Sequence, residues 1–324
     1  MRYRKFGRTP WDISEITFGA WQLGGTWGQV SEKDAISTLL YAFDNGINMV
    51  DTAAAYGGGR SEELVGKAIA SRRSEKIYVA TKILPIGVNH GIQNIDSIKG
   101  QYPAWYVQDQ VDAALRRLKT ERIDLLQLHL WIEDGVECFE WLEGLASLMI
   151  SGKVGAIGVS LADIKPETGV GLAKTGLVSS IQTIYNIFEQ APAETLFPAG
   201  SDTNTAFIAR VPFDSGSLTG GWSKDTYKSW AKTDKRHSMY RNGRFEETLK
   251  RVEAVKAECA AYYTNLAEAA LRFCLSNPSV STVACGMRNC EEVDMNVKYA
   301  DGDVFPTELV HALKKHAWAH SFYD

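Results

Sequence analysis

Residues 48–59 read Asn-Met-Val-Asp-Thr-Ala-Ala-Ala-Tyr-Gly-Gly-Gly, and the arrangement of the chain can be inferred outward from this stretch. The apolar run Ile47 to Val50 predicts a buried strand that ends at the ionisable residue Asp51. Tyr56 follows on a turn marked by glycines 57–59. In a repeated strand and helix protein, both side chains would lie at the carboxyl end of a strand, where such proteins usually carry their chemistry.

The same pattern of strand, loop and helix repeats along the chain. Residues 1–16 alternate in type around Gly7-Arg8-Thr9-Pro10, which predicts a short hairpin before the repeat begins. Eight strands are predicted after it, over residues 16–20, 47–51, 77–82, 123–129, 154–160, 178–184, 205–211 and 280–285. Helices are predicted over residues 31–45, 61–71, 106–119, 136–151, 163–174, 265–276 and 289–299.

Strands that alternate with helices and read as unbroken apolar runs indicate a parallel sheet covered on both faces. Eight such units favour an α/β fold of the closed (β/α)8 TIM barrel type, formed as a single domain over residues 1–324, with the N-terminal β-hairpin closing one end. An open doubly wound sheet is the competing arrangement. No Gly-x-Gly-x-x-Gly follows the first strand, however, as a dinucleotide-binding half of that fold would require.

Two predicted connections are longer than is usual in compact domains. They cover residues 83–104, after the third strand, and residues 220–245, after the seventh. The second is rich in aromatic and arginine residues, which are Trp222, Trp230, Tyr240, Arg236, Arg241 and Arg244. A mobile lid over a ligand and a decorated solvent loop fit this composition equally well.

The composition is that of a soluble globular protein, with 45% hydrophobic and 23% charged residues among 324. A net charge of −4 provides no basic field, which argues against a nucleic-acid partner. No apolar run approaches the roughly 20 residues of a bilayer span, and no signal-peptide segment opens the chain, so a cytoplasmic enzyme is expected. The five cysteines form no Cys-x-x-Cys pair and are expected to be reduced, and no cluster of histidines indicates a metal.

Polar residues end three consecutive predicted strands. Asp51 ends the second strand, Lys82 the third and His129 the fourth, and Tyr56 lies just beyond Asp51. Each residue alone has an ordinary structural explanation. Asp51 could cap a turn, Lys82 could be a solvent-facing charge at the barrel rim, His129 could be a hydrogen-bonded core residue and Tyr56 could be a packed loop aromatic. Consecutive strand ends of a parallel barrel meet in one patch, however, so we expect the four side chains to lie together.

Such a group has a defined chemistry. A tyrosine has a reference pKa of about 10, and an adjacent ammonium stabilises the phenolate and brings proton transfer into range. Lys82 would supply that charge, Asp51 would hold Lys82, and His129 would orient a substrate oxygen. A lysine Schiff base at Lys82, as in an unrelated TIM-barrel lyase or isomerase, is an alternative use of the same strand end.

Four motifs in this order resemble the aldo-keto reductase superfamily: Asp51-Thr-Ala-x-x-Tyr56-Gly, Ala-Thr-Lys82, Asp124-Leu-Leu-Gln-Leu-His129 and Lys153-Val-x-Ala-Ile-Gly-Val-Ser160. The resemblance runs from Gly7 to Asn296. It implies a (β/α)8 barrel and reversible hydride transfer between a nicotinamide cofactor and a carbonyl or alcohol carbon, with Tyr56 moving the proton.

The resemblance also implies contacts to the nicotinamide and the pyrophosphate. Ser160 and Gln182 fall where the family holds the carboxamide, although the family's Ser-Asn pair is here Ser160-Leu161. Arg210 stands where many relatives place an aromatic ring, and a planar guanidinium can stack there instead. Residues 212–220 resemble the loop that binds the pyrophosphate. The positions implied are Trp21, Ser160, Gln182, Arg210, Pro212, Phe213, Ser215, Gly216 and Ser217.

Residues 286–296 resemble the family's motif for the adenosine end, Gly-x-Arg-x-x-x-Gln-x-x-x-Asn. Its defined positions are here Gly286, Arg288, Glu292 and Asn296. Arg288 at a helix start suits a 2′-phosphate. The negative charge of Glu292 does not favour binding of that phosphate. Glu292 also fits a capping box with Asn289. NADP(H) is therefore the expected cofactor, and NAD(H) is the alternative.

The expected protein is an NAD(P)H-dependent aldo-keto reductase or alcohol dehydrogenase whose partner is a small polar or sugar-like carbonyl compound. Aromatic and arginine-rich loops suit a polyol, because they can stack on it and hydrogen-bond to it. The alternative is a cofactor-binding, redox-sensing regulatory subunit with slow or no turnover, since one fold hosts several functions.

Overall fold

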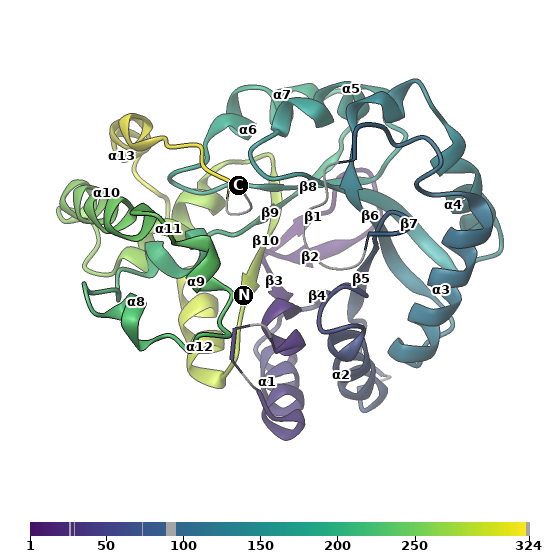
Figure 1. Ribbon diagram of the computed structural model, residues 1–324, viewed down its shortest axis with the longest axis horizontal. Helices are drawn as coiled ribbons and strands as arrows, with labels where there is room; N and C mark the ends of the chain where they lie inside the picture. Colours follow the sequence, from purple (N-terminus) through teal and green to yellow (C-terminus); the bar gives the residue numbers. More distant parts are fainter. Residues whose placement is uncertain (26, 29, 73, 89–94, 322–324) are drawn as a thin grey trace.

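The computed structural model describes residues 1–25, 27–28, 30–72, 74–88 and 95–321. Within these residues, eight parallel strands close into a barrel in the order β10-β3-β4-β5-β6-β7-β8-β9, and helices surround the barrel (Figure 1). The strands are β3 (Ile16–Gly19), β4 (Met49–Asp51), β5 (Tyr78–Ile83), β6 (Ile123–Trp131), β7 (Val154–Leu161), β8 (Ser180–Ile184), β9 (Ala206–Arg210) and β10 (Val280–Gly286). The predicted (β/α)8 barrel is confirmed.

The helices lie mostly between consecutive strands. The longer ones are α1 (Glu32–Asp44), α2 (Arg60–Ala70), α3 (Ala104–Leu118), α4 (Glu140–Ile150), α5 (Val170–Thr175), α10 (Arg244–Cys259), α11 (Leu266–Ser276), α12 (Cys290–Tyr299) and α13 (Thr307–Leu313). The shorter ones are α6 (Ala191–Glu194), α7 (Leu196–Ala199), α8 (Thr226–Ser229), α9 (Arg236–Met239) and the 3-10 turns η1 (Ala20–Gly24), η2 (Glu133–Val136), η3 (Pro166–Gly169), η4 (Asp214–Thr219) and η5 (Lys314–His316). No helix in the described ranges is long and apolar enough to cross a bilayer.

Local sequence signals account for the repeated units. The side chain of Ser31 accepts a hydrogen bond from the backbone N–H of Asp34 at 3.1 Å and caps α1. In β6, Leu126 and Leu128 pack between the barrel and the helices, whereas Leu125 packs inside the barrel. The strand is thus buried on both faces, as its unbroken apolar run predicts.

The predicted hairpin is present and closes one end of the barrel. Its antiparallel strands are β1 (Tyr3–Lys5) and β2 (Asp12–Ser14). Phe6, Trp11 and Ile13 pack against side chains that point into the barrel, namely Met49, Ala80, Leu125, Ala156, Ala206, Ile208 and Ala284. The amino ends of the strands are therefore sealed by apolar contacts, and within the described residues the barrel opens at the carboxyl ends.

Helix starts differ from prediction at two places. The helix predicted over residues 136–151 begins at Glu140, and that predicted over 163–174 begins at Val170, after the 3-10 turn η3. Pro166 explains the second shift, since the residue before a proline is kept out of the helical region. Asp163 consequently lies in a loop at the carboxyl end of β7. Sequence reasoning also missed α10, a helix of 16 residues.

Residues 220–245 fold onto the barrel rather than forming a solvent loop. They include α8 and α9, and Trp230 and Tyr240 are buried with Phe245 in a cluster of their own. Trp222 packs on this cluster, with ring centroids 4.9 Å from Tyr240 and 5.8 Å from Phe245. The decorated solvent loop, one of the two expectations for this segment, is therefore wrong.

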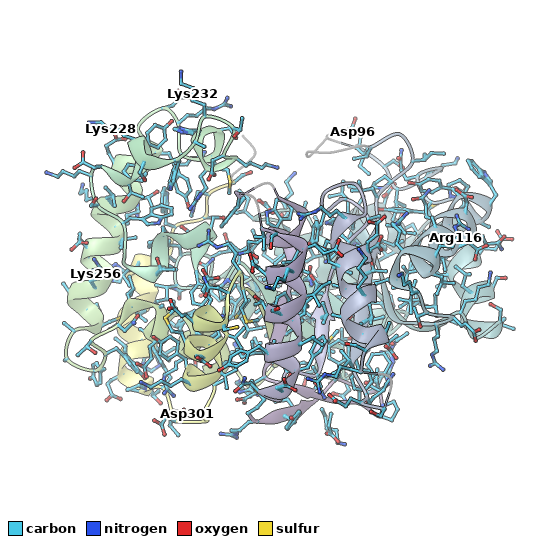
Figure 2. All side chains as sticks on the ribbon, turned by 90° about the horizontal axis from the view of Figure 1, so that it is seen from below. Asp96, Arg116, Lys228, Lys232, Lys256 and Asp301 are labelled. Atoms are coloured by element: carbon cyan, nitrogen blue, oxygen red, sulfur yellow. The ribbon has the colours of Figure 1, made fainter. Side chains whose placement is uncertain are left out.

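Both long connections lie at the same end of the barrel. In the side view of Figure 2, Asp96 of one connection and Lys228 and Lys232 of the other lie at the end opposite Asp301. In the connection of residues 83–104, residues 89–94 lie outside the described residues. The two connections border the open end of the barrel, where the predicted site residues are found.

Candidate active site

Three of the predicted catalytic side chains lie on neighbouring strands of the barrel. Asp51 is the last residue of β4, and parallel pairing sets it opposite Ala80 of β5. Lys82, two residues further along β5, pairs with Gln127 of β6. His129 lies two residues beyond Gln127. Because side chains two residues apart share one face of a strand, these groups point into the open end of the barrel.

Lys82 is the centre of the site. Its Nζ donates hydrogen bonds to Asp51 Oδ2 at 2.5 Å, to Tyr56 Oη at 3.1 Å and to the carbonyl oxygen of Thr52 at 3.0 Å. The Lys82 side chain is fully buried and that of Asp51 is 6% exposed. All three donor positions of the ammonium are therefore used, which fixes Lys82 next to the phenol of Tyr56.

Two aromatic rings flank Tyr56. The indole of Trp21 lies 5.0 Å from the Tyr56 ring and the imidazole of His129 lies 5.8 Å from it, both edge to face. The Nδ1 atom of His129 is buried and makes no hydrogen bond within the described residues. Beside the phenol, the Nδ1 atom of His129 is therefore a polar group that is open to a ligand in the cavity.

The buried environment sets the charge of each group. Burial raises the pKa of Tyr56, and Lys82 offsets only part of the rise, so the phenol stays protonated and its pKa is not lowered as expected from Lys82 alone. Burial opposes the charge of Lys82, but Asp51 and Tyr56 outweigh it and raise the pKa of Lys82. Burial, together with Lys82 and Arg210, lowers the pKa of His129 well below its usual range.

These directions predict the pH dependence of turnover. Because Tyr56 stays protonated and His129 stays neutral, neither group changes its charge between about pH 7 and pH 9. If Tyr56 is the proton donor that the family resemblance implies, carbonyl reduction needs the protonated phenol and should keep a constant kcat over this range. Alcohol oxidation would then need the phenolate and should become faster as pH rises. Steady-state rates in both directions check this; a fall in the reduction rate centred near pH 7 would contradict it.

Two glutamine side chains hold Asp51 in place. Gln127 Nε2 and Gln182 Nε2 each donate to Asp51 Oδ1, both at 3.1 Å. Gln182 was expected to hold a carboxamide, and its amide oxygen stays available for that contact because its nitrogen is the group bound to Asp51. Gln127 was not identified from the sequence. The two-residue period of β6, which puts it on the same face as His129, is the signal that would have found it.

A cavity of about 550 Å³ opens at this end of the barrel. All predicted site residues except Lys82 and Ser217 line it. Lys82 lies behind Asp51 and Tyr56, whereas Ser217 is buried and donates its hydroxyl to Asp214 Oδ2 at 2.6 Å. The cavity extends from Tyr56 to Asn296, so one ligand can reach both ends.

An ion pair lies near the nicotinamide end of this cavity. Arg210 donates to Asp163 Oδ1 at 2.7 Å and to the carbonyl oxygen of Leu161 at 3.1 Å. Asp163 lines the cavity, is 5% exposed, and its Oδ2 makes no hydrogen bond within the described chain. Sequence reasoning missed Asp163 because it assigned this residue to a helix and no motif singles it out.

The predicted pyrophosphate loop has an unusual backbone. Asp214, Ser215 and Gly216 adopt φ values of 46°, 55° and 105°, which lie in the left-handed region. Ser215 and Gly216 also line the cavity. The backbone N–H groups of Asp214 and Gly216 donate to the carbonyl oxygens of Val211 and Phe213, so the loop is a tight turn that brings small residues to the cavity wall. The local geometry therefore leaves room for phosphate oxygens.

At the adenosine end, Glu292 is paired with Arg288. The guanidinium lies 3.0 Å from Glu292 Oε1, and the backbone N–H of Arg288 donates to Oε2 at 2.8 Å. Asn289 accepts from the N–H of Glu292 at 2.9 Å, which confirms the predicted cap of α12. The guanidinium expected to face a 2′-phosphate is thus already paired with a neighbouring carboxylate.

The open end of the parallel barrel holds a buried lysine between a carboxylate and a phenol, which is the arrangement that the sequence predicts for an oxidoreductase. The sequence model described as Aldo/keto reductase family matches residues 15–317. The chain belongs to the aldo/keto reductase family, and its chemistry uses a nicotinamide cofactor.

Individual relatives agree with this assignment. The chain is 32% identical over 322 residues to the uncharacterized oxidoreductase YqkF of Bacillus subtilis, covering 98% of this chain and 96% of the relative. Among solved structures, it resembles the aldo-keto reductase AKR11C1 from Bacillus halodurans in its holo form, with TM-score 0.77, 26% identity and coverage of 99% and 97%. It also resembles the glycerol dehydrogenase AKR11B4 from Gluconobacter oxydans, with TM-score 0.77, 26% identity and coverage of 97% and 94%.

The cavity wall fits such a cofactor. Several buried polar atoms on it make no hydrogen bond within the described residues, namely Trp21 Nε1, Gln22 Oε1, His129 Nδ1 and Asp163 Oδ2. Buried polar groups are normally paired, so these atoms indicate a polar ligand. Left-handed backbone near the middle of the cavity and Arg288 at its far end add two positions for phosphate.

Proposed function

We propose that this chain catalyses the reversible, NAD(P)H-dependent reduction of a small polar or sugar-like carbonyl compound to its alcohol. The observation that carries the proposal is the buried ammonium of Lys82, which bonds both Asp51 and Tyr56 at the cavity wall. In this proposal Asp51, Tyr56, Lys82 and His129 form the catalytic group.

Each residue has one task. When bound, a nicotinamide cofactor supplies a hydride to the carbonyl carbon or accepts it from the alcohol. Tyr56 donates its proton to the carbonyl oxygen, and Lys82 stabilises the phenolate that remains. Neutral His129 orients the same oxygen through a hydrogen bond. In the oxidising direction the phenolate takes the alcohol proton.

Features of the cavity support a polar substrate. The rings of Trp21, Trp27 and Trp222 line its mouth and suit stacking on a polyol. The Oδ2 atom of Asp163, whose other oxygen is paired with Arg210, would accept a hydrogen bond from a hydroxyl group. The likeness to a glycerol dehydrogenase structure supports the same substrate class.

Turnover assays test this function. Reduced nicotinamide absorbance is followed with a panel of aldehydes, hydroxyketones and aldoses, and formation of the reduced cofactor with glycerol and other polyols. We expect multiple turnovers, with hydroxylated carbonyl compounds preferred over apolar aldehydes of equal size. Tight cofactor binding without turnover on any member would instead favour the redox-sensing regulatory subunit. Trapping of a substrate on Lys82 by borohydride would indicate Schiff-base chemistry.

For the cofactor, we infer that NADP(H) is preferred through Arg288 and that Glu292 limits the preference. Glu292→Gln removes a negative charge beside the 2′-phosphate and releases the guanidinium of Arg288. We expect NADPH to bind about five- to tenfold more tightly at low salt, with NADH unchanged, and a smaller gain at high salt. Paired titrations of NADPH and NADH measure this. Glu291→Gln on the same turn is the matched control, and an equal gain for NADH would refute the inference.

A further inference from the structure

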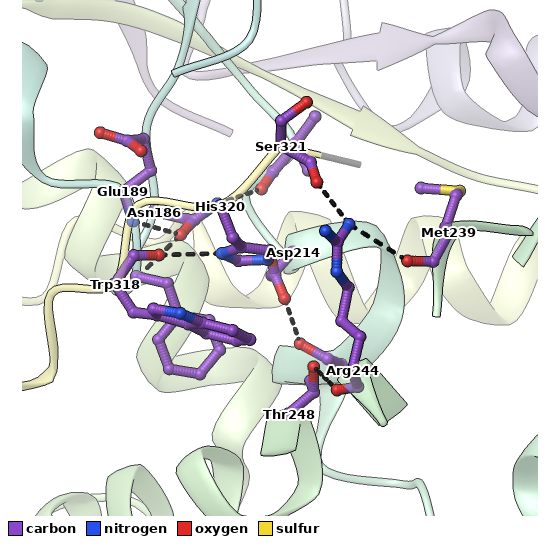
Figure 3. Close-up of polar contacts among 12 residues, drawn as sticks. Asn186, Glu189, Asp214, Met239, Arg244, Thr248, Trp318, His320 and Ser321 are labelled. Atoms are coloured by element: carbon purple, nitrogen blue, oxygen red, sulfur yellow. Dashed lines mark hydrogen bonds and ion pairs between the residues drawn. The ribbon is translucent and has the colours of Figure 1, made fainter. Parts of the chain in front are cut away.

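The chain segment of residues 317–321 reaches the loop that carries η4 (Figure 3). The backbone N–H of Trp318 donates to the carbonyl oxygen of Phe188 at 2.7 Å. The carbonyl oxygen of Ser321 accepts a hydrogen bond from Arg244 at the start of α10. Both ends of the segment are thus anchored, and the family match ends at residue 317, before these contacts.

His320 lies between two oxygen atoms in this segment. Its Nε2 lies 3.1 Å from Asp214 Oδ1, and its Nδ1 lies 2.8 Å from the carbonyl oxygen of Trp318. The carbonyl oxygen can only accept a hydrogen bond from Nδ1–H, and the contact between Nε2 and the carboxylate is an ion pair only when Nε2 also carries a proton, so the doubly protonated imidazole satisfies both oxygens. The side chains of His320 and Asp214 are 8% and 2% exposed, which keeps water from replacing either contact.

Asp214 connects this segment to the predicted pyrophosphate loop. Its second carboxylate oxygen accepts from Ser217, and its carbonyl oxygen accepts from Tyr240 Oη at 2.9 Å. Its φ of 46° is one of the left-handed values on which the shape of the loop depends. Gain or loss of the proton on His320 therefore acts, through Asp214, on the backbone that would face the phosphates.

Charged groups surround His320 on every element packed against it. Asp214 faces it from η4, Glu189 from the loop after β8, and Arg244 from α10 (Figure 3). Arg251 of α10 lies over the Trp318 ring, 4.4 Å from its centroid. Burial disfavours the charged imidazole, but Asp214 outweighs that effect and the pKa of His320 is raised above its ordinary value.

We propose that residues 317–321 form a strap that positions the pyrophosphate loop, and that the His320–Asp214 pair is a proton-dependent latch which sets the affinity for the cofactor. The inference rests on the proposed placement of the cofactor phosphates on residues 212–220. His320 is a positioning residue, because it acts on the loop through Asp214.

The sign of the effect follows from the raised pKa. The latch is complete below the ordinary histidine pKa of about 6.5 and is lost as pH rises through the raised value. Loss of the proton leaves Asp214 with an unpaired buried charge beside a loop that binds an anion. Both the repulsion and the loosened strap weaken cofactor binding, so affinity falls toward alkaline pH.

Titrations of NADH into the full chain between pH 6 and pH 9, at constant ionic strength, test the latch. NADH is the probe because the 2′-phosphate of NADPH itself titrates near pH 6, as phosphate monoesters do. We expect the Kd of the wild type to rise by about tenfold across this range. In His320→Gln we expect weak binding at pH 6 and no pH dependence, so that the two curves meet at high pH. His311→Gln, on the exposed face of α13, should match the wild type.

Hydrogen exchange of residues 213–220 without cofactor gives a second readout. After correction for intrinsic exchange, the protection of this loop from hydrogen exchange should fall as pH rises in the wild type. In His320→Gln the loop should stay unprotected at all pH values. Equal pH profiles of Kd and of protection in the two proteins would overturn the latch while leaving the proposed function intact. A folded wild type with pH-dependent loop protection that binds neither NADH nor NADPH would overturn the proposed function and the role of the latch in cofactor affinity, and would leave only the proton-dependent hold of the strap on the loop.

Discussion

Tyr56→Phe is expected to lower kcat/KM for carbonyl reduction by a factor of about 10² to 10⁴, the usual contribution of a positioned proton donor. The substitution removes only the hydroxyl that lies 3.1 Å from Lys82. The ring keeps its contacts with Trp21 and His129, so the protein should fold and bind cofactor as before. The loss should therefore appear in kcat, with the cofactor Kd changed little.

Single-turnover and steady-state rates with the best carbonyl substrate measure this effect. Tyr41→Phe, in α1 and away from the cavity, makes the same chemical change and should leave the rates unchanged. If Tyr56→Phe retained the wild-type rate, another group would have to supply the proton, and the assignment of Tyr56 would be wrong.

Lys82→Met is expected to remove both activity and stability. The substitution leaves the Asp51 carboxylate buried without its cation, and breaking a buried pair in this way costs about 3–5 kcal/mol in the free energy of unfolding. The rate of carbonyl reduction should fall at least as far as in Tyr56→Phe, because the phenolate loses its neighbouring charge. Urea unfolding and steady-state assays measure the two effects.

The double variant Asp51→Asn/Lys82→Met separates them. A neutral amide has no unpaired charge, and Gln127 and Gln182 can still donate to its oxygen. Most of the lost stability should therefore return while activity stays absent. A double variant as unstable as Lys82→Met alone would show that the buried charge of Asp51 is not the cause, and recovered activity would exclude Lys82 from the chemistry.

Most of the barrel was predictable because its strands are buried on both faces. A strand such as β6 must be apolar at consecutive positions, and this pattern is visible without any partner. Helix boundaries were less predictable where a short-range signal competes with periodicity, as Pro166 does before α5. Half of the residues of the missed helix α10 are charged, and its position depends on packing by a few residues such as Phe245 and Val252.

Some residues of the candidate site could be predicted from the sequence and others could not. Asp51, Lys82 and His129 end strands whose directions follow from the repeat, so their convergence could be inferred. Asp163 lines the same cavity and Gln127 supports it from behind Asp51, but the residue type alone does not reveal either role along the chain. Their roles depend on which side chains lie opposite, at Arg210 and Asp51.

The barrel, its open end and the meeting of Asp51, Lys82 and His129 could be predicted from the chain alone, because strand period and strand direction depend on neighbouring residues. The protonation of Tyr56 and the contacts of the loop of residues 212–220 with the rest of the chain became visible only in the folded structure. Burial raises the pKa of Tyr56 beyond what Lys82 offsets. His320 meets Asp214 across 106 positions of sequence, counted as 320 minus 214. Desolvation and long-range pairing arise from packing in three dimensions, and no local pattern of residues encodes either one.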